Sequence, residues 1–110
     1  MTDLSIEATN EGTYIITATY TDESGAAVTP ATMAWSLLTY NGVVINSRSA
    51  TSITPGTSNA IVLSGDDLKQ TDGNKRVISF EGTYDSATYG NGLPLKGQAN
   101  FTIGNWVEEL

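Results

Sequence analysis

The side chains that most often transfer protons or bind metals are missing from this sequence. None of its 110 residues is histidine or cysteine. Histidine is the usual general base and a common metal ligand, and cysteine supplies thiolates and disulfides. Any proton transfer or metal binding would therefore depend on carboxylates. We predict no catalytic residue, no cofactor and no metal site, and we expect that the protein is not an enzyme.

Asp66 and Asp67 are the first carboxylates to consider. Glycoside hydrolysis needs two acids that face each other across a cleft. These two are sequence neighbours on a predicted helical turn, so they do not face each other. Ser64, with Asp67 three residues later, resembles a capping box. We therefore predict one helical turn over Ser64–Leu68, with the acids stabilising its N-terminus.

Asp22, Glu23 and Asp85 form a second group of carboxylates, at the ends of two predicted strands. If these loops meet at one end of the fold, their oxygens could gather around Ca²⁺. The spacing of a calcium-binding loop is absent. Solvated loop charges are the preferred interpretation, and a calcium-stabilised linker domain of an adhesin is the alternative.

Recognition is the remaining kind of chemistry, and the segment Asp85–Lys96 suits it. We predict that this segment is the longest loop of the protein. It contains Tyr89, Asn91 and several glycines, with Tyr84 just before it. Tyrosine and glycine in an exposed loop make an adaptable binding surface.

The C-terminal segment Trp106–Leu110 is the second candidate for recognition. An exposed tryptophan is a typical interface anchor. The alternative is that Trp106 packs against the base of the domain. The predicted partner-binding residues of the two segments are Tyr89, Asn91, Trp106, Val107 and Leu110.

The elements that would position these residues are β-strands, and the central strand is predicted over Thr32–Tyr40. Apolar side chains alternate along it with period two, which is typical of a pleated strand. Trp35 lies in the middle and is large enough to anchor two facing sheets. The next residues, Asn41–Gly42, predict a type I′ turn, with a returning strand at Val43–Ile45.

The rest of the chain is predicted to consist of further strands and turns. Arg48 would protect the edge of a polar edge strand. The further predicted strands are Leu4–Ala8, Thr13–Thr21, Asn46–Ser52, Ala60–Leu63, Arg76–Tyr84 and Gln98–Ile103. The predicted fold class is all-β, an immunoglobulin-like β-sandwich of about seven antiparallel strands. It would span residues 1–105, with residues 106–110 as a C-terminal tail.

Composition and charge limit the partners. A hydrophobic fraction of 39% with only 15% charged residues favours one folded core over disorder. The formal net charge of −7 argues against nucleic acid, whose phosphates require Lys and Arg. No run approaches the roughly 18 apolar residues of a membrane span, so no membrane is expected. Acidity favours solubility at high local concentration, or docking on a basic partner.

Several stretches together resemble a known group of proteins. They are Ile16–Pro30, Asn41–Ser49, Ile61–Leu68, Phe80–Ser86 and Gly90–Ile103. The combination resembles small immunoglobulin-like structural proteins of tailed bacteriophages and prophages. The resemblance covers most of the chain, brings no catalytic residues, and leaves the tail Trp106–Leu110 outside the pattern.

The resemblance implies a virion component, either a capsid decoration protein or a head, neck or tail accessory protein. It would assemble in the host cytoplasm and dock on the phage capsid or tail protein, and it could also form a homo-oligomer on the virion. The alternative is a carbohydrate- or cell-surface-binding module, since Tyr89 and its neighbours could stack on a host-surface glycan. Both hypotheses describe non-enzymatic proteins.

Overall fold

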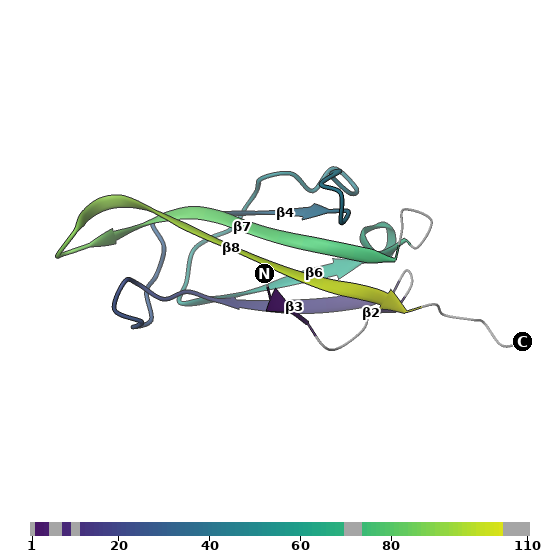
Figure 1. Ribbon diagram of the computed structural model, residues 1–110, viewed down its shortest axis with the longest axis horizontal. Helices are drawn as coiled ribbons and strands as arrows, with labels where there is room; N and C mark the ends of the chain where they lie inside the picture. Colours follow the sequence, from purple (N-terminus) through teal and green to yellow (C-terminus); the bar gives the residue numbers. More distant parts are fainter. Residues whose placement is uncertain (1, 5–7, 10–11, 70–73, 105–110) are drawn as a thin grey trace, which may run out of the picture.

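The structure is a computed structural model that describes residues 2–4, 8–9, 12–69 and 74–104. The fold is all-β, with two sheets and no α-helix within these residues (Figure 1). Its elements are β1 (Thr2–Asp3), β2 (Ala8–Thr9), β3 (Thr13–Thr19), β4 (Thr32–Leu38), β5 (Thr51–Ser52), β6 (Ser58–Ser64), the 3₁₀ turn η1 (Gly65–Leu68), β7 (Lys75–Ser86) and β8 (Gly90–Gly104). The all-β prediction is confirmed.

The strands form one larger and one smaller sheet. The larger sheet has the order β1-β8-β7-β4-β5, with β2 also paired to β8, and the smaller one consists of β3 and β6. The six strands from β3 to β8 pair antiparallel. By contrast, β1 and β2 pair parallel with β8, so the prediction of a wholly antiparallel fold is wrong at the N-terminus. The predicted strand Leu4–Ala8 is replaced by these two short strands, and residues 5–7 lie outside the described part.

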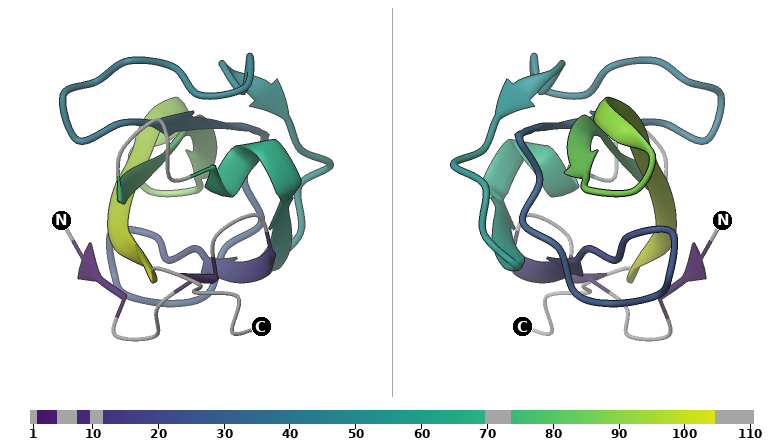
Figure 2. Two further views of the ribbon diagram at one scale, coloured as in Figure 1. Left: turned by 90° about the vertical axis from the view of Figure 1, so that its right-hand side faces the viewer. Right: turned by 90° about the vertical axis from the view of Figure 1, so that its left-hand side faces the viewer.

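The core lies between the two sheets, where the predicted alternation is confirmed. Along β4 the buried residues are Met33, Trp35 and Leu37, while the residues between them are half-buried. Ile16, Ile61 and Leu63 of the smaller sheet, and Tyr20 just after β3, are buried in the same core. Viewed end-on, the strands of both sheets are arranged around the long axis of the molecule (Figure 2).

The turn after β4 differs from its prediction. Gly42 N donates to Thr39 O, and Thr39 N donates to Val43 O. Only Gly42, at φ 92°, has a positive φ in this turn, whereas a type I′ turn needs two such residues. The turn is therefore of the longer kind in which a single glycine with positive φ forms a bulge where the chain turns back. The predicted returning strand Val43–Ile45 is reduced to a single bridge between Leu38 and Val44.

The largest correction concerns the predicted long loop Asp85–Lys96. Here β7 continues to Ser86 and β8 begins at Gly90, so the segment is the end of a β-hairpin. Residue pairing continues from Lys75↔Thr102 to Ser86↔Gly90, with one irregularity near the tip. In Figure 1 this hairpin projects beyond the ends of β3, β4 and β6.

Gly82 lies in the regular part of β7, paired with Met33 of β4 and Leu95 of β8 without a bulge. The irregularity lies between Tyr84 and Ser86 instead. A Cβ atom at Gly82 would lie 2.0 Å from the carbonyl oxygen of Thr32 on β4. Glycine is therefore required here because two backbones approach closely.

Candidate functional site

The tip of the β7–β8 hairpin is the first candidate site. The connection between the strands is a three-residue turn, residues 87–89. Tyr89 is 67% exposed, and Asn91, two residues later at the start of β8, is exposed as well. The structure thus brings these two predicted partner-binding residues together at one projecting end, on a hairpin rather than a loop.

Hydrogen bonds within the tip fix its backbone. Ser86 Oγ accepts bonds from the N–H groups of Thr88 (3.2 Å) and Tyr89 (3.1 Å). Asp85 Oδ1 accepts a bond from Gly92 N at 2.9 Å. Gly90 and Gly92 have positive φ, which glycine adopts without strain. The exposed ring is therefore carried by an ordered turn.

Glu23, from the loop after β3, braces the hairpin from the side. The Tyr84 hydroxyl donates to Glu23 Oε1 at 3.0 Å, and the Ser86 hydroxyl donates to Glu23 Oε2 at 3.2 Å. Burial raises the pKa of the Tyr84 phenol, and the adjacent Glu23 carboxylate raises it further. The phenol therefore stays protonated at neutral pH and keeps donating this bond.

Asp22 stabilises the loop that carries this brace. Its Oδ1 accepts bonds from Ser24 N, Ser24 Oγ and Ala26 N. The bonds from Ser24 and Ala26 lower the pKa of Asp22, so the carboxylate stays ionised. A bridge between Thr21 and Ala27 closes the loop.

The three carboxylates predicted as solvated loop charges thus have specific structural partners. Asp22 caps its own loop, Glu23 braces the hairpin, and Asp85 caps the hairpin turn. Within the described residues, no group of three His, Cys, Asp or Glu side chains could hold a metal ion. The three carboxylates therefore stabilise the hairpin tip and the loop beside it through hydrogen bonds.

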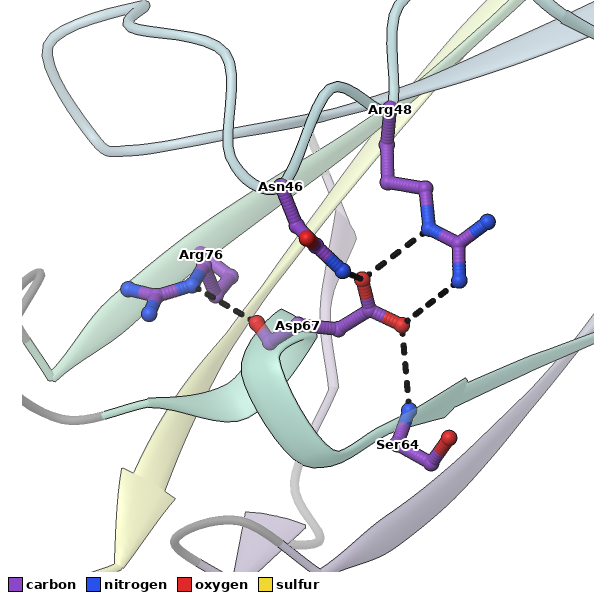
Figure 3. A network of polar contacts seen from close by, with 5 residues as sticks. All are labelled: Asn46, Arg48, Ser64, Asp67 and Arg76. Atoms are coloured by element: carbon purple, nitrogen blue, oxygen red, sulfur yellow. Dashed lines mark hydrogen bonds and ion pairs between the residues drawn. The ribbon is translucent and has the colours of Figure 1, made fainter.

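A second cluster of charges surrounds the buried Asp67 of η1 (Figure 3). Asp67 Oδ1 accepts bonds from Asn46 Nδ2 (2.9 Å) and Arg48 Nε (3.0 Å). Its Oδ2 accepts bonds from Arg48 Nη2 (3.2 Å) and Ser64 N (3.1 Å). The last bond is the one that the predicted capping box requires. Four donors occupy the lone pairs of the carboxylate, so it has no capacity left to act as a base.

The electrostatics of this cluster agree with a structural role. Burial raises the pKa of Asp67, but hydrogen bonds from Arg48, Asn46 and Ser64 outweigh that effect and hold it below the ordinary 3.8. The carboxylate is therefore ionised at neutral pH. The guanidinium of Arg48 also lies 5.5 Å from the ring centroid of Trp35. Arg48 thus joins the 46–50 segment to η1, and its predicted role as an edge-protecting charge is wrong.

Arg76 is a buried cation that the sequence did not single out. Its guanidinium donates to the carbonyl oxygens of Asp67 (3.1 Å), Lys69 (2.7 Å) and Lys75 (3.0 Å). Two of these bonds satisfy carbonyl groups at the end of the 3₁₀ turn, and the third joins the guanidinium to the start of β7. A basic residue at the first position of a predicted strand gives no signal for such a role.

Two exposed apolar surfaces were also not predicted as sites. Ile15 and Val62 are paired directly across β3 and β6 on the outer face, at 60% and 54% exposure. Tyr40, Val43 and Val44 are exposed around the turn after β4. The period-two pattern of β3 does place Ile15 outward, so that signal was present in the sequence.

The other predicted partner-binding residues, Trp106, Val107 and Leu110, lie outside the described residues, as does the boundary between residues 105 and 106. In the part of the chain that is described, no helix is long and apolar enough to cross a membrane. Comparison with protein-family models, with curated proteins and with solved structures found no match.

Proposed function

We propose that this protein is a non-enzymatic virion structural protein, which docks on a phage capsid or tail protein through the tip of its β7–β8 hairpin. The observation that carries the docking proposal is the exposed Tyr89 on a projecting, braced turn. A rigid aromatic side chain at a protruding tip provides a large contact area at low entropic cost. The phage setting rests on the resemblance of the sequence.

The strand order supports an immunoglobulin-like fold. In that fold the third, sixth and seventh strands form one sheet, and the second and fifth belong to the other. If β1 with β2 counts as the first strand and β5 as the fourth, then β4, β7 and β8 share one sheet here and β3 pairs with β6. The first and fourth strands depart from that pattern, because β1 and β2 pair with β8 and β5 pairs with β4. The buried Trp35 lies on the third strand, which is where this fold places its core tryptophan.

The charge distribution supports a protein partner in an assembly. A net charge of −7 keeps free copies apart in solution and favours a neutral or basic docking surface. It also disfavours adhesion to the packaged nucleic acid. Copies would assemble on the virion in the host cytoplasm, either singly or as a homo-oligomer.

Cosedimentation with particles tests this proposal. The full chain is mixed with particles assembled from the capsid or tail protein encoded beside it. We expect cosedimentation to be lost for Tyr89→Ala and kept for Tyr40→Ala, which removes a similarly exposed ring elsewhere. Truncation after Gly104 tests whether the tail Trp106–Leu110 contributes as well. Purified virions that lack the chain by mass spectrometry, or full binding by Tyr89→Ala, would contradict the proposal.

A second candidate function is the binding of a host-surface glycan. The exposed ring of Tyr89 could stack on a sugar, with the amide of Asn91 available nearby for hydrogen bonds. A glycan array with the full chain tests this reading. Signals that disappear with Tyr89→Ala would favour it over protein docking, and an array without signals would remove it.

A further inference from the structure

The outer edge of β8, opposite β7, is paired with β1 only at Ala99 and Asn100, away from the tip of the hairpin. Residue pairing between β7 and β8 is regular from Thr102 back to Leu93. Leu4 N donates to Asn100 O on the outer side, whereas Ile103 N donates to Asn74 O on the side of β7. Because these directions alternate along a strand, the even-numbered residues of β8 turn their backbone groups outward.

This outer edge has backbone groups without a strand partner. On that side β1 pairs only from Ala99 onward. Among the described residues, no strand pairs with Lys96 there, so its N–H and C=O remain available. Pro94, two residues earlier, has no N–H, and proline is tolerated in a strand where that group would face away from the sheet. The open edge is therefore short and centred on Lys96.

An open space lies under the same edge. A pocket of about 180 Å³ is lined by the end of β3, by the middle of β8 and by core residues, including Tyr20, Met33, Phe80 and Leu95. Gly97 lies between the inward-facing Leu95 and Ala99, and a Cβ atom there would meet nothing within 4 Å. The missing side chain of Gly97 leaves room for one apolar side chain from outside.

We propose that an extended segment of another protein adds to β8 as a strand, pairing with Lys96 and placing one apolar side chain into the pocket over Gly97. Main-chain bonds give such strand addition its affinity, and side-chain pockets give it specificity. The proposal does not rest on docking through Tyr89.

Charge favours a different protein over a second copy of this chain. Each copy carries a formal charge of −7, so two copies repel. Near the site, Lys96 is already paired with Glu81 at 3.2 Å, and the loop beyond Thr21 carries Asp22 and Glu23. The segment that fits is therefore neutral or basic, with alternating apolar residues.

Selection from a library of random nine-residue peptides by ribosome display, with the full chain as target, tests this. We expect enriched peptides with period-two apolar residues and basic flanks. Fluorescence anisotropy with the labelled peptides should show at least tenfold weaker binding to Gly97→Val, which fills the space, and to Lys96→Pro, which removes the outward N–H.

The matched control is Ala60→Val, which adds a similar side chain at an exposed position on β6 and should bind normally. Tyr89→Ala should also bind normally, which separates this proposal from the tip. Hydrogen exchange on the unmodified chain should show slower exchange at Lys96 when peptide is added. No enrichment, equal binding by Gly97→Val, or unchanged exchange at Lys96 would overturn the proposal.

Discussion

At the scale of single residues, the network around Asp67 has an asymmetry that can be measured. Asp67 is fully buried, whereas the side chain of Arg48 is 37% exposed. Removing the arginine leaves a buried carboxylate without its cation. Removing the carboxylate leaves a cation that water can still reach. The two partners of one ion pair should therefore differ in how much their loss destabilises the fold.

We predict that Arg48→Met lowers the free energy of unfolding by about 3–5 kcal/mol, the usual loss when one partner of a buried pair is removed. Asp67→Asn should lower it by only about 1–3 kcal/mol, because one unsatisfied polar group is the main consequence. Urea unfolding of both variants and of the double variant measures this. Equal effects of the two single substitutions would contradict the asymmetry.

The same carboxylate makes stability depend on pH. The folded-state pKa of Asp67 lies below its unfolded value of 3.8. Its contribution is therefore fully present above pH 3.8 and is lost as the pH falls through the folded-state pKa. Urea midpoints between pH 5 and about pH 2 should decrease for the parent chain and decrease less for Asp67→Asn. Parallel curves would show that other carboxylates govern acid unfolding.

Some of this network was predictable and some was not. The sequence spacing of Ser64 and Asp67 predicted the local turn, because the capping interaction spans three residues. Arg48 is 19 residues from Asp67 in the chain, and nothing near it indicates a buried partner. A contact of that kind depends on how the 46–50 segment folds over the sheet, where Asn46, Ser47 and Ala50 have positive φ.

At the scale of elements, the alternation of apolar residues predicted the core-facing side of β4 correctly. The β7–β8 hairpin was missed because its glycines and its proline are typical of loops. In the structure, Gly90 and Gly92 serve the turn with positive φ, and Pro94 lies in a strand whose outer edge is open there. Composition alone does not distinguish an irregular loop from a strand that needs these residues at particular positions.

The contact between β4 and β7 gives a prediction for this scale. We expect Gly82→Ala to lower the free energy of unfolding by about 1–3 kcal/mol or more, because its Cβ would overlap Thr32 O and force the strands apart. Gly97→Ala is the matched control, as the same added methyl group meets open space. Thermal and urea unfolding measure the stability of both variants. If Gly82→Ala were as stable as the parent chain, the backbones of β4 and β7 would not approach as closely as described here.

At the scale of the whole molecule, the hairpin end should be separable from the sandwich that supports it. Replacing residues 85–92 with a two-residue Asn-Gly turn between the paired Tyr84 and Leu93 shortens the hairpin. We expect a loss of about 1–2 kcal/mol in the free energy of unfolding, because the bond from Ser86 to Glu23 disappears. Cosedimentation with particles should be lost.

The folding of the shortened chain must be checked alongside its cosedimentation, by two measurements. Urea unfolding should remain a single transition, and near-ultraviolet circular dichroism should still report a packed Trp35. Retained cosedimentation would show that docking uses another surface. A chain without packed tertiary structure would show that the hairpin end is part of the folding core, which the position of Tyr84 and Glu23 outside the central core cluster argues against.

The parallel pairing of β1 with β8 has a mechanical consequence. Tension between Thr2 and Gly104 pulls these two strands in opposite directions along their length, so their shared hydrogen bonds are loaded in shear and must rupture together. Tension between Thr2 and its direct partner Ala99 instead acts across the two strands and opens the bonds one after another. In optical tweezers, the first pulling direction should therefore require the higher rupture force. A domain built this way resists being stretched along the line that joins its first and last strands.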